Sequence, residues 1–199
     1  MKNCRKNRIS CVVLPLVAAS LLGCAARPSH TELASTARQA APIPQAVRDD
    51  FDVAMKLMKS EEYGKGIELL NGVATKSQNN AVPHINLAIA YAKIGNLKNS
   101  EDSLKAALEL EPDNPVANNE LGLLYRKTGR FGEAKQAYEN ILKKYPDYPL
   151  VHKNLGILCD LYLRDYACAL KEYETYSSAM PEDKNAKIWI SDIQKRLGK

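Results

Sequence analysis

The sequence of 199 residues lacks an excess of charge of either sign beyond its first residues. The formal net charge is +5, but four basic residues precede residue 24 (Lys2, Arg5, Lys6 and Arg8), and the remaining chain carries 24 basic and 23 acidic residues. This balance produces no long-range field that would attract a polyanion. We therefore expect no nucleic-acid partner.

Catalytic and metal-binding signatures are also missing. The sequence contains no Gly-rich phosphate loop and no Gly-x-Ser-x-Gly, Ser-x-x-Lys or His-Glu-x-x-His motif. There are only three histidines, His30, His84 and His152, and no acid–base or nucleophile constellation accompanies them. We expect a protein that is not an enzyme and that needs no cofactor or metal. An enzyme with an unrecognised site remains the less favoured alternative.

The N-terminus has no apolar run long enough for a stable membrane span, because the run from Ile9 to Leu22 is too short. A basic start followed by such a run is typical of a signal peptide. It ends in Leu-Leu-Gly-Cys at Cys24, which resembles the lipobox of bacterial lipoproteins. The resemblance implies a signal peptide over residues 1–23 and diacylglycerol on the thiol of Cys24. The alternative is an ordinary secretory signal with an incidental cysteine.

The residues after Cys24 bear on where the protein is anchored. In Gram-negative lipoproteins an aspartate at the next position retains the protein on the inner membrane, whereas this chain has Ala25. The resemblance therefore implies a lipid anchor in the outer membrane, facing the periplasm. Residues 24–46 are rich in Ala, Pro, Ser, Thr and Gln, which predicts a flexible tether. A short amphipathic helix over residues 35–41 is the alternative.

Residues 115–148 predict two helices joined by a tight turn. Leu121, Gly122 and Tyr125 share one face of the first helix, and Gly129 ends it because glycine reaches the left-handed conformation without steric cost. Pro146 ends the second helix. The apolar face of that second helix consists of Phe131, Ala134, Tyr138, Ile141 and Leu142.

The same pattern recurs every 34 residues, in 47–80, 81–114 and 149–183, the last with one extra residue placed in the turn. The order Leu-Gly-x2-Tyr, Ala-x3-aromatic, Pro resembles the tetratricopeptide repeat. The usual leading Trp is replaced by His84, Asn118 and His152, and we expect both histidines to be packing residues.

The resemblance implies an all-α fold. We expect a right-handed α-α superhelix of about four helix pairs over residues 47–183. Residues 184–199 then form a capping helix with Trp189 in the core.

Five cysteines occur, and two remain in the predicted repeats. Cys4 and Cys11 leave with the signal peptide, and Cys24 carries the lipid. Cys159 and Cys168 fall on neighbouring antiparallel helices, where their Cα atoms can come within the 4.4–6.8 Å that a disulfide needs. We predict a disulfide, because an exported protein meets an oxidising compartment. Two buried free thiols are the alternative.

In the tetratricopeptide family, ligands usually lie along the concave face made by the first helix of each repeat. On this sequence that face carries an apolar stripe and a basic stripe, which match a peptide with apolar and acidic side chains. Apolar residues hold the asparagine places of carboxylate-clamp repeats, so we expect no capture of a C-terminal carboxylate. The alternative is that the apolar stripe is partly core. The candidate groove residues are Met55, Lys59, Ile89, Lys93, Leu123, Arg126, Lys127, Lys153 and Ile157.

These observations predict a lipid-anchored scaffold that faces the periplasm and binds another protein of an envelope complex. Lipid-anchored proteins of the family include pilotins, partners of cell-wall synthesis enzymes and partners of energy-transducing complexes. A soluble periplasmic chaperone is the alternative if Cys24 is not lipidated.

Overall fold

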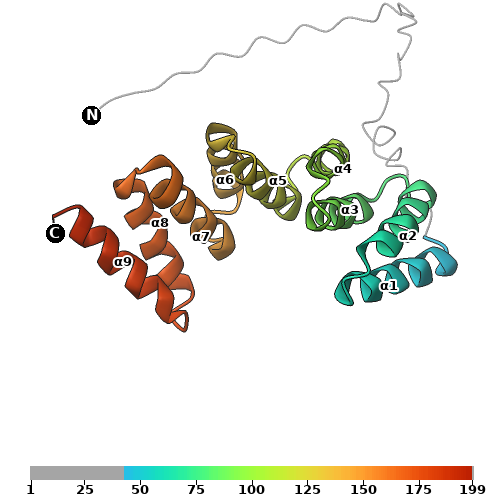
Figure 1. Ribbon diagram of the computed structural model, residues 1–199, viewed down its shortest axis with the longest axis horizontal. Helices are drawn as coiled ribbons and strands as arrows, with labels where there is room; N and C mark the ends of the chain where they lie inside the picture. The colour runs from blue at the N-terminus through green and yellow to red at the C-terminus, as the bar shows by residue number, and fades with distance from the viewer. Residues whose placement is uncertain (1–42, 199) are drawn as a thin grey trace, which may run out of the picture. The chain divides into compact units, whose positions relative to one another are not determined.

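A computed structural model of the protein describes residues 43–198, and this part of the chain is α-helical throughout, without strands. Antiparallel helix pairs follow one another in a row, and a single helix ends it (Figure 1). The pairs are α1 (Gln45–Lys59) with α2 (Tyr63–Lys76), α3 (Ala81–Lys93) with α4 (Leu97–Leu110), α5 (Pro115–Lys127) with α6 (Phe131–Lys144), and α7 (Pro149–Ile157) with α8 (Tyr166–Ala179); the last helix is α9 (Lys184–Arg196).

Polar side chains cap the N-terminal ends of several helices. The side chains of Asn80, Asn114 and Asp183 accept hydrogen bonds from backbone N–H groups in the first turns of α3, α5 and α9. Helix α1 begins at Gln45, slightly earlier than the boundary expected at residue 47. Its N-cap is Pro44, which makes no side-chain cap.

The turn inside each helix pair contains one residue in the left-handed conformation. These residues are Glu61, Gly95, Gly129 and Arg164, with φ of 61°, 80°, 77° and 53°. They are spaced by 34, 34 and 35 residues. The first and fourth turns therefore share the conformation of the other two, although residues with a Cβ, Glu61 and Arg164, hold the glycine position.

The extra residue of the fourth repeat does not lie in the turn, where the sequence pattern placed it. The end of the first helix is instead a π-helix, η1 (Leu158–Leu163), which runs directly from α7 to Arg164. A π-helix accommodates an inserted residue by widening a helical turn. The insertion thus changes which side chains the end of this helix presents, and leaves the turn unchanged.

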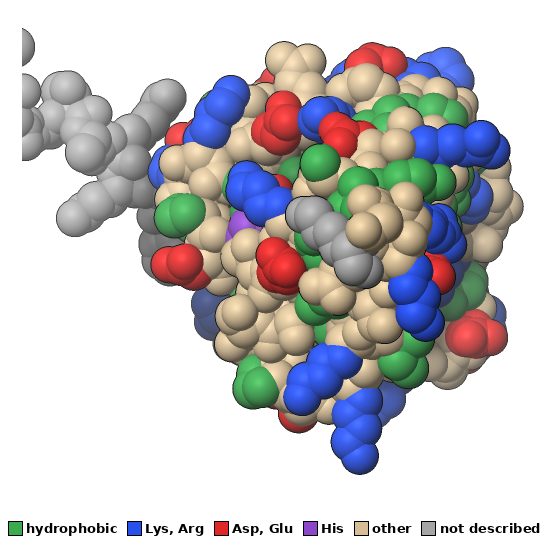
Figure 2. Space-filling model, turned by 90° about the vertical axis from the view of Figure 1, so that its left-hand side faces the viewer, with side chains coloured by type: hydrophobic (Ala, Val, Ile, Leu, Met, Phe, Trp, Pro, Cys, Tyr) green, Lys and Arg blue, Asp and Glu red, His purple; other side chains and the backbone are tan. Residues whose placement is uncertain are grey.

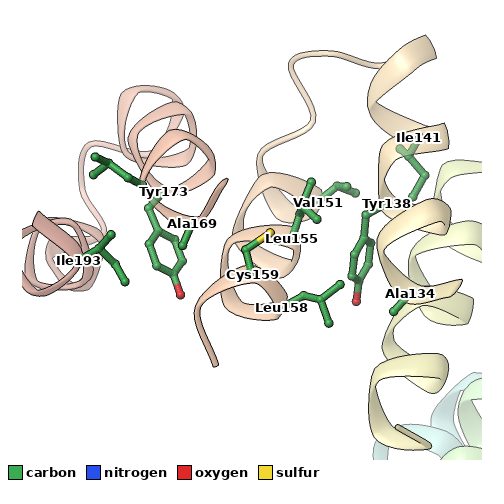
Figure 3. Packing of buried hydrophobic residues seen from close by; sticks show 11 residues of the cluster. Ala134, Tyr138, Ile141, Val151, Leu155, Leu158, Cys159, Ala169, Tyr173 and Ile193 are labelled. Atoms are coloured by element: carbon green, nitrogen blue, oxygen red, sulfur yellow. The ribbon is translucent and has the colours of Figure 1, made fainter. Parts of the chain in front are cut away.

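Three buried clusters lie along the row of helices, and the largest extends from α6 to α9. Figure 3 shows Tyr138 of α6 and Tyr173 of α8 within it, on either side of the α7–η1 helix. Both rings lie against glycines of first helices: a Cβ on Gly122 would stand 2.4 Å from Cε1 of Tyr138, and one on Gly156 would stand 2.6 Å from Cδ1 of Tyr173. The two helices of these repeats therefore approach closely at Gly122 and at Gly156.

Helix α9 covers the last repeat, as predicted for a capping helix. Trp189 packs against this cluster, with its ring 5.3 Å from that of Tyr173 and 6.3 Å from that of Tyr176. Figure 2 looks onto this end of the stack, where basic and acidic side chains are mixed around hydrophobic ones. Neither sign of charge covers this end.

Candidate protein-binding face

The first helices of successive repeats bring an apolar row to the surface. Val82, Val116 and Leu150 occupy the second position of α3, α5 and α7, and they are 43%, 43% and 47% exposed. Residues seven apart lie on the same side of a helix, so a second row follows on the same face. We call the surface formed by both rows the first-helix face. Its members are Val82, Val116 and Leu150 in the outer row and Ile89, Leu123 and Ile157 in the inner row.

The inner row was predicted from the sequence, and the outer row was missed. Ile89, Leu123 and Ile157 are half-buried, and Ile89 and Ile157 pack against the clusters beneath them. Met55 is likewise half-buried against the first cluster. The apolar stripe is thus partly core, which was the alternative interpretation. The missed signal is the 34-residue spacing of three apolar residues just inside the helix starts.

The predicted basic residues fall into two groups. Lys59, Lys93 and Lys127 are exposed near the ends of α1, α3 and α5. Lys153 is instead bound within the protein: its Nζ lies 3.3 Å from Oδ2 of Asp183 and 3.4 Å from the Tyr176 hydroxyl. Its ammonium also lies over the ring of Trp189, 5.2 Å from the centroid. Lys153 therefore holds the capping helix in place.

Two buried amides join the third and fourth repeats beneath this face. Nδ2 of Asn154 donates to Oδ1 of Asn119 at 2.8 Å, and both side chains are buried. Such a satisfied pair costs little and fixes the register of α5 against α7. The two rows of the first-helix face therefore keep their alignment across this boundary.

Arg126 lies at the same boundary, and its situation differs from that of the other predicted cations. Its Cζ is 6.0 Å from the ring centre of Tyr162, which belongs to η1. Within residues 43–198, its Nη1 is buried and has no hydrogen-bond partner, and the same holds for the hydroxyl of Tyr138. Burial raises the pKa of Tyr138, so this hydroxyl remains protonated at neutral pH.

Asp160 occupies the position of Arg126 one repeat later, and it is fully engaged. Nη1 of Arg196 lies 3.1 Å from its Oδ1, and the hydroxyl of Tyr173 donates to its Oδ2 at 3.4 Å. Tyr173 and Asp160 thus occupy the same repeat positions as Tyr138 and Arg126. The hydroxyl of Tyr173 has a hydrogen-bond partner, whereas that of Tyr138 has none within residues 43–198. Burial raises the pKa of Tyr173 and the Asp160 charge adds to this, whereas Arg126 opposes it.

The two predicted cysteines are joined in the structure. Cys159 of η1 and Cys168 of α8 form a disulfide with a Cα–Cα distance of 5.9 Å. The bond ties the π-helix to the following helix. It therefore holds the segment that carries Asp160 and Tyr162.

A cavity of about 260 Å³ lies at the N-terminal end of the first-helix face. Its apolar wall includes Val82 of the outer row and Phe51, a first-helix residue of the first repeat. Ile43, Val47 and Val73 complete that wall. The apolar surface thus has a recess large enough for an apolar side chain at one end.

Both histidines of the described repeats are packing residues, as predicted. His152 is buried, with Nδ1 2.6 Å from Oε2 of Glu172 and Nε2 2.7 Å from the carbonyl oxygen of Pro146. His84 is half-buried in α3. Neither takes part in an acid–base constellation on the first-helix face.

The lipidation site predicted at Cys24 lies outside the described residues. In residues 43–198, no cluster of three or more metal-ligating side chains occurs. The helices of this part are also too short or too polar to cross a membrane.

A comparison with known protein families finds a match in the middle of the chain. A family model described as tetratricopeptide repeat matches residues 95–156, which include α4, α5, α6 and most of α7. This match covers less than half of the chain. No curated protein matches the sequence significantly.

Several solved structures resemble most of the chain in their fold. MamA from Desulfovibrio magneticus has a TM-score of 0.68 and 15% identity, over 78% of this chain and 88% of that one. The pilF protein of Pseudomonas aeruginosa has a TM-score of 0.69 and 18% identity, over 76% and 69%. A chain of the APC/C hetero-tetramer Cut9–Hcn1 has a TM-score of 0.65 and 18% identity, over 76% and 30%. At these identities the likeness establishes the fold, a right-handed superhelix of helix pairs.

Proposed function

We propose that the protein is a lipid-anchored scaffold that binds a segment of another cell-envelope protein on its first-helix face. The exposed outer row carries this proposal. Val82, Val116 and Leu150 recur at equal spacing on neighbouring helices, whereas isolated exposed apolar residues are ordinary and need no explanation. An ordered apolar row beside lysines fits an apolar and acidic partner segment.

The lipobox-like sequence supports the location. Cleavage before Cys24 would leave residues 24–42 between the lipid and the first described residues. The first-helix face would then be held near the membrane surface, and Ala25 favours the outer membrane. The likeness to pilF, at 18% identity, supports the architecture of such a scaffold.

Site-directed photo-crosslinking in the cells that make the protein tests this function. A photoreactive residue at Val116 should give a discrete crosslinked partner, whereas one at Lys105, on the exposed side of α4, should not. Adding the substitution Leu123→Asp to the protein with the photoreactive residue at Val116 should abolish the crosslink. The helical circular dichroism signal of this variant should remain unchanged. Crosslinks from Lys105 that survive Leu123→Asp would show that the protein binds through its second helices.

A separate arm tests the anchor. The Cys24→Ser variant should be absent from the membrane fraction. Its crosslink from Val116 should also weaken, because partner and scaffold are no longer held at the same membrane surface. Retention in the membrane fraction with an unmodified residue 24 would contradict lipid anchoring. A crosslink that persists at full strength in soluble protein would favour a soluble chaperone.

A further inference from the structure

A polar groove of about 490 Å³ lies between α2 and α4, the second helices of the first two repeats. We call it the second-helix groove, and none of its lining residues belongs to the first-helix face. Helix α3 contributes His84, Leu87 and Tyr91 to it, with Leu87 buried and the other two half-buried. Side-chain amides and hydroxyls line much of the rest, from Asn71, Thr75, Gln78, Asn99 and Ser103.

A second groove, of about 500 Å³, lies at the equivalent place between α6 and α8, and its lining is charged. One member is Glu172, whose Oε2 lies 2.6 Å from Nδ1 of His152. In the second-helix groove, the repeat pattern puts Ser103 and His84 at these two positions. Burial alone lowers the pKa of His84, because within residues 43–198 no charged group or hydrogen bond acts on its ring. The ring nitrogens of His84 therefore remain available to a ligand.

Between the second and third repeats, an ion-pair network occupies the corresponding place. The guanidinium of Arg130 lies 4.0 Å from the ring centre of Tyr125. It donates to Glu101 at 2.8 Å and to Glu133 at 2.7 Å. Tyr91 is the equivalent of Tyr125 one period earlier, and in the described part of the chain no cation lies over its ring. Uncharged residues stand at the three ion-pair positions there, namely Ile67, Asn96 and Asn99.

The lining of the second-helix groove indicates an uncharged ligand. Asp102 is its one charged lining residue, and Nζ of Lys98 donates to this carboxylate at 2.8 Å. The exposed lining residues are all polar, so an apolar peptide segment fits poorly. A sugar ring has the matching chemistry, because its C–H faces pack on an aromatic ring and its hydroxyls both donate and accept hydrogen bonds.

We propose that the second-helix groove binds an uncharged glycan, with one sugar ring against Tyr91 and its hydroxyls hydrogen-bonded to Asn99 and Ser103. The polar wall residues of α2 would contact the neighbouring sugars of the strand. This site is separate from the first-helix face, and the inference does not rest on the proposed function.

A panel of hexasaccharides provides the probe. Maltohexaose, xylohexaose and chitohexaose are added to the mature protein in a detergent without a sugar headgroup, and binding is followed by saturation-transfer NMR. At least one of the three should bind. Hexagalacturonic acid, which carries a carboxylate on each sugar, should bind at least about threefold more weakly, because the groove offers no free cation to its charges. Absence of binding by all three uncharged sugars at about 5 mM, or tighter binding of the acidic one, would overturn the inference.

Two variants fill the groove with side chains that neighbouring repeats already hold. Ser103→Glu places a carboxylate opposite His84, as in the fourth repeat, and Asn96→Arg/Asn99→Glu places a guanidinium over Tyr91, as in the third. Each should weaken binding of the hexasaccharide by about tenfold or more, with the melting temperature within about 5 °C of wild type. Asn99→Ala, which removes one amide from the wall, should weaken it by about threefold or more.

The matched control for these changes is Ser191→Glu, which adds the same charge on the exposed side of α9 and should change hexasaccharide binding by less than about twofold. Leu123→Asp should also leave this binding unchanged, so a failure of the first-helix face and a failure of this groove are distinguishable. Full binding in both filled variants would show that the glycan binds elsewhere. In cells, a photoreactive residue at Thr75 should give no discrete protein partner. A protein crosslink from Thr75 that Ser103→Glu abolishes would show that the groove holds a protein segment, and would overturn the inference.

Discussion

The contact between Gly122 and Tyr138 allows a quantitative test of how the repeats are packed. A Cβ added to Gly122 would stand 2.4, 2.8 and 2.9 Å from three carbons of the Tyr138 ring, whereas ordinary contact begins near 3.4 Å. The ring is fully buried and has no free side to move toward. Gly122→Ala should therefore cost about 1–3 kcal/mol through overpacking, against a gain of about 1 kcal/mol in helix propensity.

The second repeat supplies the compensating change. Its corresponding residues are Ala88 and Leu104, which are both buried in one cluster. Tyr138→Leu alone should leave a gap against Gly122 and cost roughly 1–3 kcal/mol. The double variant Gly122→Ala/Tyr138→Leu reproduces the pair of the second repeat, so the two changes should couple by about 1–3 kcal/mol and the double variant should lie within about 1 kcal/mol of wild type.

Urea denaturation followed by circular dichroism measures these free energies of unfolding. Gly72→Ala is the matched control, since a Cβ on this glycine inside α2 would meet nothing within 4 Å, and it should stabilise by up to about 1 kcal/mol. Additive costs in the double variant would refute the reasoning, because they would show that Gly122 and Tyr138 do not share a contact. A Gly122→Ala variant as stable as Gly72→Ala would refute it as well.

Three further predictions concern other parts of the chain. Mass spectrometry of the mature protein should find an N-terminal Cys24 with acyl chains, and a mature form that begins at another residue would contradict the lipobox interpretation. Thiol labelling of the unfolded, unreduced protein should find Cys159 and Cys168 blocked, and the double alanine variant should lose roughly 2–3 kcal/mol of stability because the disulfide restrains a short loop in the unfolded chain. Burial lowers the pKa of His84, so the unfolded chain takes up this proton at a higher pH than the folded protein, and stability should fall as the pH drops below about 6.5. Denaturation midpoints at pH 7.5 and 5 should differ less in His84→Gln than in wild type, and an unchanged difference would exclude His84 as a contributor.

Local sequence signals predicted much of the fold because each one acts within a few residues. Asn80 and Asn114 accept from N–H groups two or three positions ahead, and Gly95 and Gly129 take the left-handed conformation within a single turn. The 34-residue period then follows from the repetition of these short-range rules. The first and fourth turns show their limit: Glu61 and Arg164 hold the same conformation without glycine, so the conformation of these turns could not be predicted from the residue type.

The sequence predicted only some of the residues of the candidate site. Leu123 and Arg126 were predicted because they lie on the first helix at the spacing that marks its ligand face. The bonding state of Arg126 could not be predicted, because it depends on where Asp160 and Arg196 lie, and these are 34 and 70 residues away in sequence. A periodic pattern treats Arg126 and Asp160 as equivalent.

The hydrogen bonds of Arg126 and Asp160 distinguish these two equivalent positions. The capping helix brings Arg196 to Asp160 at 3.1 Å and completes that pair. The π-helix brings Tyr162 beside Arg126, and its own carboxylate, Asp160, is bound by Arg196 and by the hydroxyl of Tyr173. The terminal helix thus satisfies Asp160, whereas Nη1 of Arg126 has no hydrogen-bond partner within residues 43–198. The third repeat therefore differs from the fourth in the bonding of this position, although the periodic sequence pattern makes the two equivalent.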